Sequence, residues 1–239
     1  MTSYQMKPYQ TIREQAYECN RQIPELGLAI YTFGNVSAFD ADLGLFAIKP
    51  SGVAYDELTP EAMVVVDLDN QVVEGKLRPS SDTPTHTVLY RAFPGIGGIV
   101  HTHSTYAVAW AQAQRPIPIY GTTHADHLAG EIPCTAVMGD EEIQGDYETE
   151  TGNQIIKTFQ GLSHLEVEMV LVACHGPFTW GKTPHSALYN SAVLEEIAKM
   201  ALLTERVDPN VRPLKETLIA KHYQRKHGAG AYYGQKPSL

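Results

Sequence analysis

The chain contains 239 residues, of which 43% are hydrophobic, enough to bury the core of one full-sized domain. Its formal net charge of −9 argues against general nucleic-acid binding, because that requires a basic surface. The cysteines Cys19, Cys134 and Cys174 are too widely spaced for a disulfide framework, and no apolar run approaches the ~20 residues of a membrane span. We therefore expect one cytoplasmic domain over residues 1–239, with no nucleic-acid or membrane partner.

The first third of the chain predicts one helix followed by a sheet. Apolar residues at helical spacing predict a helix over residues 9–23, which Pro24 and Gly27 end. Short β-branched runs then predict strands over residues 29–32, 36–39, 44–48, 63–68 and 71–73. Asp69 and Asn70 predict a tight turn before the last of these strands.

Later segments alternate between helix and strand. Helices are predicted over residues 85–93 and 104–113 and from residue 184 onward, with Thr-Pro pairs marking the first and last helix starts. Strands are predicted over residues 97–103 and 169–174. Gly176 and Pro177 are expected to break the second strand and let His175 emerge into a cavity.

Three histidines and one aspartate lie at the expected ends of these elements. His101 and His103 are two residues apart on one strand and so share a face. His175 follows the second strand, and Asp82 precedes a helix. We expect the four to gather around one divalent metal, because three imidazoles and a carboxylate suit zinc or a similar ion and leave room for substrate oxygens. The His-x-His pair alone would be weak evidence.

A nicotinamide site is not expected. The glycine-rich stretch over residues 95–100 has Val100 where the third fingerprint glycine belongs, and it lies before a strand instead of after one. The C-terminal residues 221–234 are basic and rich in tyrosine. They predict either a solvated helix that frays at its end or a segment whose cations and phenols reach an anionic substrate.

Several short blocks of the sequence resemble the L-ribulose-5-phosphate 4-epimerases of the class II aldolase and adducin-head superfamily, and the resemblance extends over nearly the whole chain. The blocks are Gly34-Asn35-Val36-Ser37, Lys49-Pro50-Ser51-Gly52, Pro79-Ser80-Ser81-Asp82-Thr83-Pro84-Thr85-His86, His101-Thr102-His103-Ser104, Gly121-Thr122-Thr123-His124-Ala125-Asp126, His175-Gly176-Pro177-Phe178 and the tail over residues 221–234. The resemblance implies a three-layer α/β/α domain with a central, mainly antiparallel sheet. It also implies a homotetramer with active sites between neighbouring subunits.

The resemblance implies roles for individual residues. Asp82, His101, His103 and His175 would bind Zn²⁺, or Mn²⁺ in its place. Asp126 and Tyr233 would carry protons, with Tyr233 contributed by an adjoining subunit. The substrate phosphate would be bound by Asn35, Ser37, Lys49, Ser51, Gly52, Ser80, Ser81 and His222. No role is assigned to His124, His127 or Glu148, which lie near the matching blocks.

Two departures bear on the assignment. The aldolases of the superfamily usually have a catalytic glutamate where this chain has Asp82, whereas the epimerases have an aspartate that binds metal, so Asp82 favours an epimerase. Ala173 and Cys174 replace the expected His-Ser before His175, which removes a spare imidazole and introduces a thiol.

The resemblance implies interconversion of L-ribulose 5-phosphate and D-xylulose 5-phosphate. The C4 proton of such a pentulose is not acidic, so we expect cleavage of the C3–C4 bond, rotation of glycolaldehyde phosphate and re-addition to its other face. One alternative is a class II aldolase that releases its fragments, and another is a non-catalytic module like the adducin head. The sequence does not distinguish arabinose catabolism from ascorbate or another sugar pathway.

Overall fold

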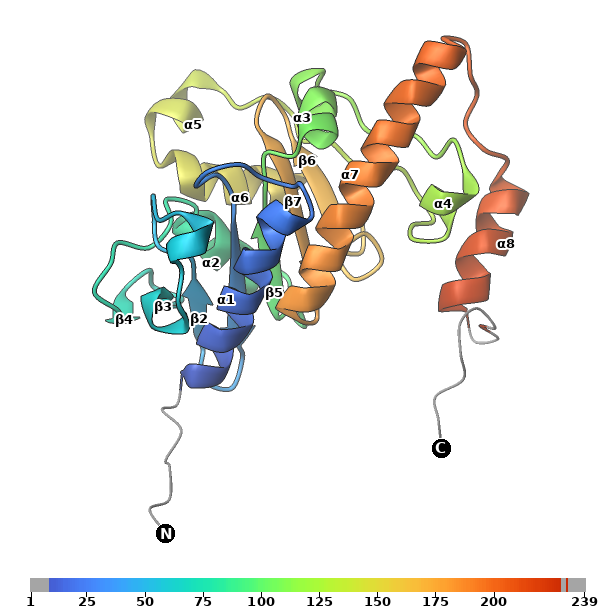
Figure 1. The fold of residues 1–239 in the computed structure, drawn as a ribbon. Helices are drawn as coiled ribbons and strands as arrows, with labels where there is room; N and C mark the ends of the chain where they lie inside the picture. The colour runs from blue at the N-terminus through green and yellow to red at the C-terminus, as the bar shows by residue number, and fades with distance from the viewer. Residues whose placement is uncertain (1–8, 229–230, 232–239) are drawn as a thin grey trace, which may run out of the picture.

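The computed structural model describes residues 9–228 and 231, and in it one antiparallel sheet lies between two layers of helices (Figure 1). The seven strands have the order β4-β3-β2-β1-β5-β7-β6, and every pairing between them is antiparallel. Their bounds are β1 Asn35–Asp40, β2 Leu45–Ile48, β3 Val64–Asp67, β4 Val72–Glu74, β5 Gly98–His101, β6 Met169–Val172 and β7 Gly176–Gly181. This confirms the expected α/β class and the mainly antiparallel sheet.

Eight α-helices and two short 3-10 helices surround the sheet within the described residues. The α-helices are α1 Gln10–Glu25, α2 Thr83–Ala92, α3 Thr105–Gln112, α4 Thr122–Ala125, α5 Asp140–Gln144, α6 Tyr147–Thr158, α7 Pro184–Val207 and α8 Glu216–His227. The 3-10 helices are η1 Tyr55–Glu57 and η2 Pro60–Ala62. No helix in this part of the chain is long and apolar enough to cross a bilayer.

Strand alternation assigns each side chain of the sheet to one of the two helical layers. On β2, Phe46 and Ile48 pack in the core beneath α2 and α6, while Ala47 packs on the other face with α1. On β5, Ile99 belongs to the α2 and α6 face and Val100 to the opposite one. The same alternation directs His101 toward α2.

Most predicted elements are found, with four differences. Helix α1 does not end at Pro24 but continues through it to Glu25. Residues 29–30 are irregular and residues 31–32 form a turn where a strand was expected, with Tyr31 in the left-handed region at φ 55°. β5 ends at His101, so His103 lies beyond the strand. We expected only a break at Gly176 and Pro177, but β7 begins at Gly176. Pro177 is tolerated there because it lies near the start of the strand, where a missing N–H costs little.

Candidate metal centre and substrate pocket

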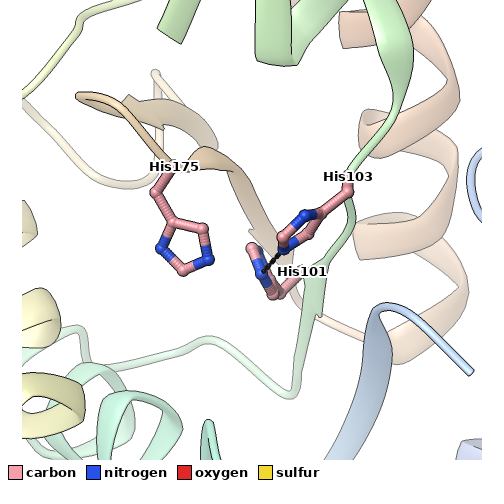
Figure 2. Close-up of side chains that lie close together, drawn as sticks. All are labelled: His101, His103 and His175. Carbon is pink, nitrogen blue, oxygen red and sulfur yellow. Dashed lines mark hydrogen bonds between the residues drawn. The ribbon is translucent and has the colours of Figure 1, made fainter. Parts of the chain in front are cut away.

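The imidazoles of His101, His103 and His175 converge on one point (Figure 2). His101 ends β5, His103 lies in the irregular segment between β5 and α3, and His175 lies in the turn between β6 and β7. One ring nitrogen from each histidine lies within 4.8 Å of the others, and the Nε2 atoms of His101 and His103 are 3.1 Å apart. A tetrahedral ion with metal–nitrogen distances of about 2.0–2.1 Å would place its ligand nitrogens about 3.3 Å apart, so the spacing of the His101 and His103 nitrogens fits such an ion.

The β6–β7 turn approaches β5 closely because Gly176 has no side chain. A Cβ at this position would lie 2.9 Å from the carbonyl oxygen of Thr102. Before it, Cys174 adopts a left-handed conformation at φ 63°, and its backbone N–H donates to Ala111 at 2.9 Å. The Cys174 side chain is exposed and does not belong to the imidazole cluster. The thiol introduced by the sequence therefore lies outside the candidate metal centre.

The hydrogen bonds and burial of the cluster favour neutral imidazoles with lone pairs available. Nδ1 of His101 lies 3.0 Å from the carbonyl oxygen of Pro177, which only accepts, so Nδ1 carries the proton and Nε2 has a free lone pair. Burial lowers the pKa of His175 to about 4 and also lowers the pKa of His103, and neighbouring imidazoles add to both effects. Because metals bind the neutral imidazole, this donor set fits a divalent cation.

Asp82 is a carboxylate that lines the same cavity, but its oxygens do not lie within 4.8 Å of all three imidazole nitrogens, so the structure brings it near the imidazole cluster without including it there. It precedes α2, and its Oδ2 accepts a hydrogen bond of 2.6 Å from the side-chain amide of Asn35. Burial alone would raise the pKa of Asp82, but His101, His86 and the Asn35 hydrogen bond together lower it. Asp82 is therefore an anion at neutral pH, as a metal ligand must be.

A polar cavity of about 410 Å³ opens beside this cluster. Two loops form much of its wall and are held together by backbone hydrogen bonds, from Ser51 to Arg78 at 2.9 Å and from Ser80 to Lys49 at 3.0 Å. The cavity brings together ten of the residues predicted from the sequence: Asn35, Lys49, Ser51, Gly52, Ser80, Ser81, Asp82, His101, His103 and His175.

Lys49 directly follows β2 and is only 2% exposed. Its ammonium donates to the Thr32 carbonyl at 3.2 Å and lies 5.0 Å from the centre of the Tyr55 ring, and in the described part of the chain it forms no ion pair. Burial lowers the pKa of Lys49 to about 8. The cavity wall thus holds a buried cation without a protein anion beside it, which suits an anionic substrate group.

Two of the predicted phosphate ligands have other partners in this structure. Ser37 is fully buried beneath the cavity, and its hydroxyl contacts His86 and Tyr90 at 2.7 and 2.6 Å, so the structure does not bring it to the cavity wall. Asn35 does line the cavity, but its amide group is used by Ser80 at 3.1 Å and by Asp82. Its position favours holding the Asp82 carboxylate over binding a phosphate.

Asp126 and His222 lie together, but away from the cavity wall. Asp126 follows α4, and α8 packs against α4 (Figure 1). The Asp126 carboxylate accepts from His222 at 2.9 Å and from two nitrogens of Arg225 at 2.9 and 2.6 Å. Burial would raise the pKa of Asp126, but these hydrogen bonds outweigh it and lower the pKa. Tyr233 lies outside the described residues.

Comparison with known proteins identifies the family. Residues 14–202 match the model of the class II aldolase and adducin N-terminal domain. The chain belongs to the class II aldolase and adducin family. A protein of Salmonella paratyphi A named L-ribulose-5-phosphate 4-epimerase UlaF is 51% identical over 227 residues, covering 95% of this chain and all of that protein. Its namesake from Salmonella typhi matches to the same extent.

Solved structures share the class II aldolase fold at lower identity. An L-fuculose 1-phosphate aldolase superposes with a TM-score of 0.72 at 23% identity, covering 92% of this chain and 98% of the aldolase. YgbL from Klebsiella pneumoniae, described as a putative aldolase/epimerase/decarboxylase, gives 0.71 at 24% identity over 90% and 99% of the two chains. At these identities the likeness establishes the fold alone.

Six further residues of this class II aldolase domain line the cavity, and among them are Tyr147 and Glu148, to which the sequence assigned no role. Tyr147 and Glu148 begin α6, and the Tyr147 hydroxyl lies 3.4 Å from Nδ1 of His175. A helix could have been predicted here from the capping residue Asp146, the acidic first turn and the apolar residues one to three turns later. Tyr147 lies near His175 because α6 packs against α2 and β6. The local sequence does not predict this packing.

Proposed function

We propose that this chain is an L-ribulose-5-phosphate 4-epimerase that interconverts L-ribulose 5-phosphate and D-xylulose 5-phosphate. The observation that carries the proposal is 51% identity to epimerases of this name over their whole length. The polar cavity supports it independently, because it combines three imidazoles, two carboxylates and a buried lysine. A cytoplasmic location would fit an enzyme acting on a phosphorylated sugar.

The metal would be bound by His101, His103, His175 and Asp82, and this donor set favours zinc, with manganese as the alternative. When bound, a divalent ion supplies a Lewis acid that stabilises the negative charge developing on the substrate oxygens as C3–C4 breaks, worth several kcal/mol. Asn35 would hold the Asp82 carboxylate in place during turnover.

The phosphate would be held at the two loops of the cavity wall. Lys49 supplies the positive charge, and Ser51, Gly52, Ser80 and Ser81 supply hydroxyl and backbone donors. Anchoring the phosphate leaves the aldehyde end of glycolaldehyde phosphate free to rotate about its own bond. The fragment can then present its other face for re-addition without leaving the cavity.

Two proton carriers are required, because the C4 oxygen lies on opposite sides before and after rotation. The family resemblance assigns these roles to Asp126 and Tyr233. Asp126 and His222 are not among the residues lining the cavity of one chain. In the homotetramer that the resemblance implies, a neighbouring copy would bring them there. The low pKa of Asp126 suits a base that starts as a carboxylate.

Product analysis tests the proposed reaction. Purified, zinc-loaded protein should convert L-ribulose 5-phosphate to D-xylulose 5-phosphate, detected by a coupled assay, while free dihydroxyacetone and glycolaldehyde phosphate stay at trace levels. Retention of both fragments is the physical difference between an epimerase and an aldolase with the same bond cleavage. Steady accumulation of the free fragments would identify an aldolase instead, and the absence of any turnover would favour an adducin-like module.

The pKa of Lys49 predicts how substrate binding depends on pH. Below about pH 8 the ammonium is charged and attracts the phosphate, and above it the charge is lost. The Michaelis constant for L-ribulose 5-phosphate should therefore rise as pH increases from 7 to 9.5. In Lys49→Met the constant should be high throughout and should lose this alkaline rise. An identical alkaline rise in wild type and Lys49→Met would remove Lys49 from phosphate binding.

A further inference from the structure

A buried imidazole behind the candidate metal centre has no role in the function proposed above. His86 lies in α2, is fully buried and does not line the cavity. Its backbone N–H donates to the Asp82 carbonyl at 3.0 Å in the first turn of the helix. Because residues four apart in a helix lie on the same face, the His86 and Asp82 side chains are neighbours on the side that faces the sheet.

A chain of hydrogen bonds fixes which nitrogen of His86 carries the proton. The Tyr90 hydroxyl contacts the Ser37 hydroxyl at 2.6 Å, and Ser37 contacts Nδ1 of His86 at 2.7 Å. A buried hydroxyl that does not donate costs about 1–3 kcal/mol, so Tyr90 donates to Ser37 and Ser37 donates to Nδ1. The neutral ring therefore carries its proton on Nε2.

This Nε2–H group is buried and has no hydrogen-bond partner among the described residues. The ionisable groups that act on the His86 ring are Asp82 and His101. Phe178 closes the same space, since its ring meets His86 edge-on at 6.2 Å and stacks on His101 at 4.2 Å. The unused donor is thus buried near the Asp82 carboxylate, which is the one anionic group that acts on this ring.

We propose that His86 is a positioning residue of the metal centre, whose Nε2–H holds the Asp82 carboxylate in its metal-binding orientation through a proton order set by Tyr90 and Ser37. The inference rests on the proposed function, because it assumes that Asp82 binds metal. His86 touches neither metal nor substrate in this role. Residues that orient metal ligands in this way typically change metal affinity roughly 10- to 100-fold when they are replaced.

Two amide substitutions separate this role from simple core packing. In His86→Asn the side-chain oxygen can still accept from Ser37, but nothing replaces Nε2–H. In His86→Gln the longer side chain brings an N–H donor toward the Nε2 position. Zinc affinity, measured on metal-free protein by competition with a chromophoric chelator, should fall roughly 10- to 100-fold in His86→Asn and largely recover in His86→Gln. The exposed His185→Asn serves as the matched control and should bind zinc like the wild type.

Thermal unfolding of the metal-free proteins shows whether each variant is folded. A folded His86→Asn protein with wild-type zinc affinity would overturn the inference while leaving the proposed function intact. If His86→Asn does not fold, Ser37→Ala decides, because it retains His86 but removes the group that fixes its proton. A weaker zinc affinity in Ser37→Ala supports the role, and an unchanged affinity overturns it. Failure of the wild type itself to bind zinc would overturn both the inference and the proposed metal centre.

Discussion

Replacing His101 with asparagine should abolish stable metal binding and lower turnover by about 100- to 1,000-fold. The catalytic stabilisation supplied by a bound metal is several kcal/mol, and each 1.36 kcal/mol changes the rate tenfold. His101 is the most buried of the three imidazoles, and its Nε2, which has the free lone pair, lies 3.1 Å from Nε2 of His103. Asparagine can still donate to the Pro177 carbonyl, so the fold should survive. Metal content by mass spectrometry and the coupled xylulose 5-phosphate assay measure the two effects.

The control for this substitution is His185→Asn. His185 lies on α7, half of its side chain is exposed, and its charged neighbour is Glu18 at 3.6 Å. Loss of this imidazole should change neither metal content nor turnover. Stoichiometric metal together with wild-type turnover in His101→Asn would refute the assignment of the imidazole cluster as the catalytic metal centre.

Replacing Asp126 with asparagine should reduce turnover by roughly 100- to 10,000-fold, the usual contribution of a positioned proton carrier. Metal content should stay at the wild-type level, because Asp126 is not part of the imidazole cluster or the cavity wall. This separation of turnover from metal content distinguishes Asp126 from a metal ligand. The coupled assay and metal analysis on the same preparation provide the measurement.

Asp126 also joins α8 to α4 through Arg225 and His222, so its replacement could act by loosening α8. Glu205→Gln is the matched control, because Glu205 forms a similar two-point pair with Arg115, at 3.1 and 2.8 Å. Limited proteolysis of α8 in both variants measures docking directly. Asp126→Asn protein with wild-type turnover would exclude the proposed proton transfer, whatever the state of α8.

The repeating patterns of the sequence predicted most strands of the sheet and the helices α1, α2, α3 and α7, because side chains buried on one face of an element repeat with its period. Val64, Val65 and Val66 alternate between two apolar layers, and such a run identifies a strand without further information. The run at residues 29–32 looks equally apolar, yet Ile30 and Tyr31 are 63% and 78% exposed. Composition alone cannot separate a buried strand from an apolar segment that lies on the surface of one chain.

The site was predictable where one element supplies several of its residues. His101 and His103 are close in sequence, and their spacing of two keeps them on one side even though β5 ends between them. Tyr147 could not be found in this way, because its contact with His175 depends on how α6 packs. Ser37 belongs to a matching block, but alternation on β1 directs it inward to His86, one helical turn away from Asp82. The matching block identified Ser37 as part of the site, but it could not show that the Ser37 side chain is buried behind the cavity wall.

The candidate metal centre depends on the close approach of the β6–β7 turn to the Thr102 backbone at Gly176. The imidazoles supply the nitrogens, but their separation depends on a hairpin that can touch the neighbouring backbone only where a hydrogen atom replaces a side chain. Even a methyl group there would push the hairpin outward and carry one ligand with it. The capacity to hold an ion is thus encoded partly by a residue with no donor atom. Surveys of natural sequences, and designs that graft this centre elsewhere, should weigh that glycine as heavily as the histidines.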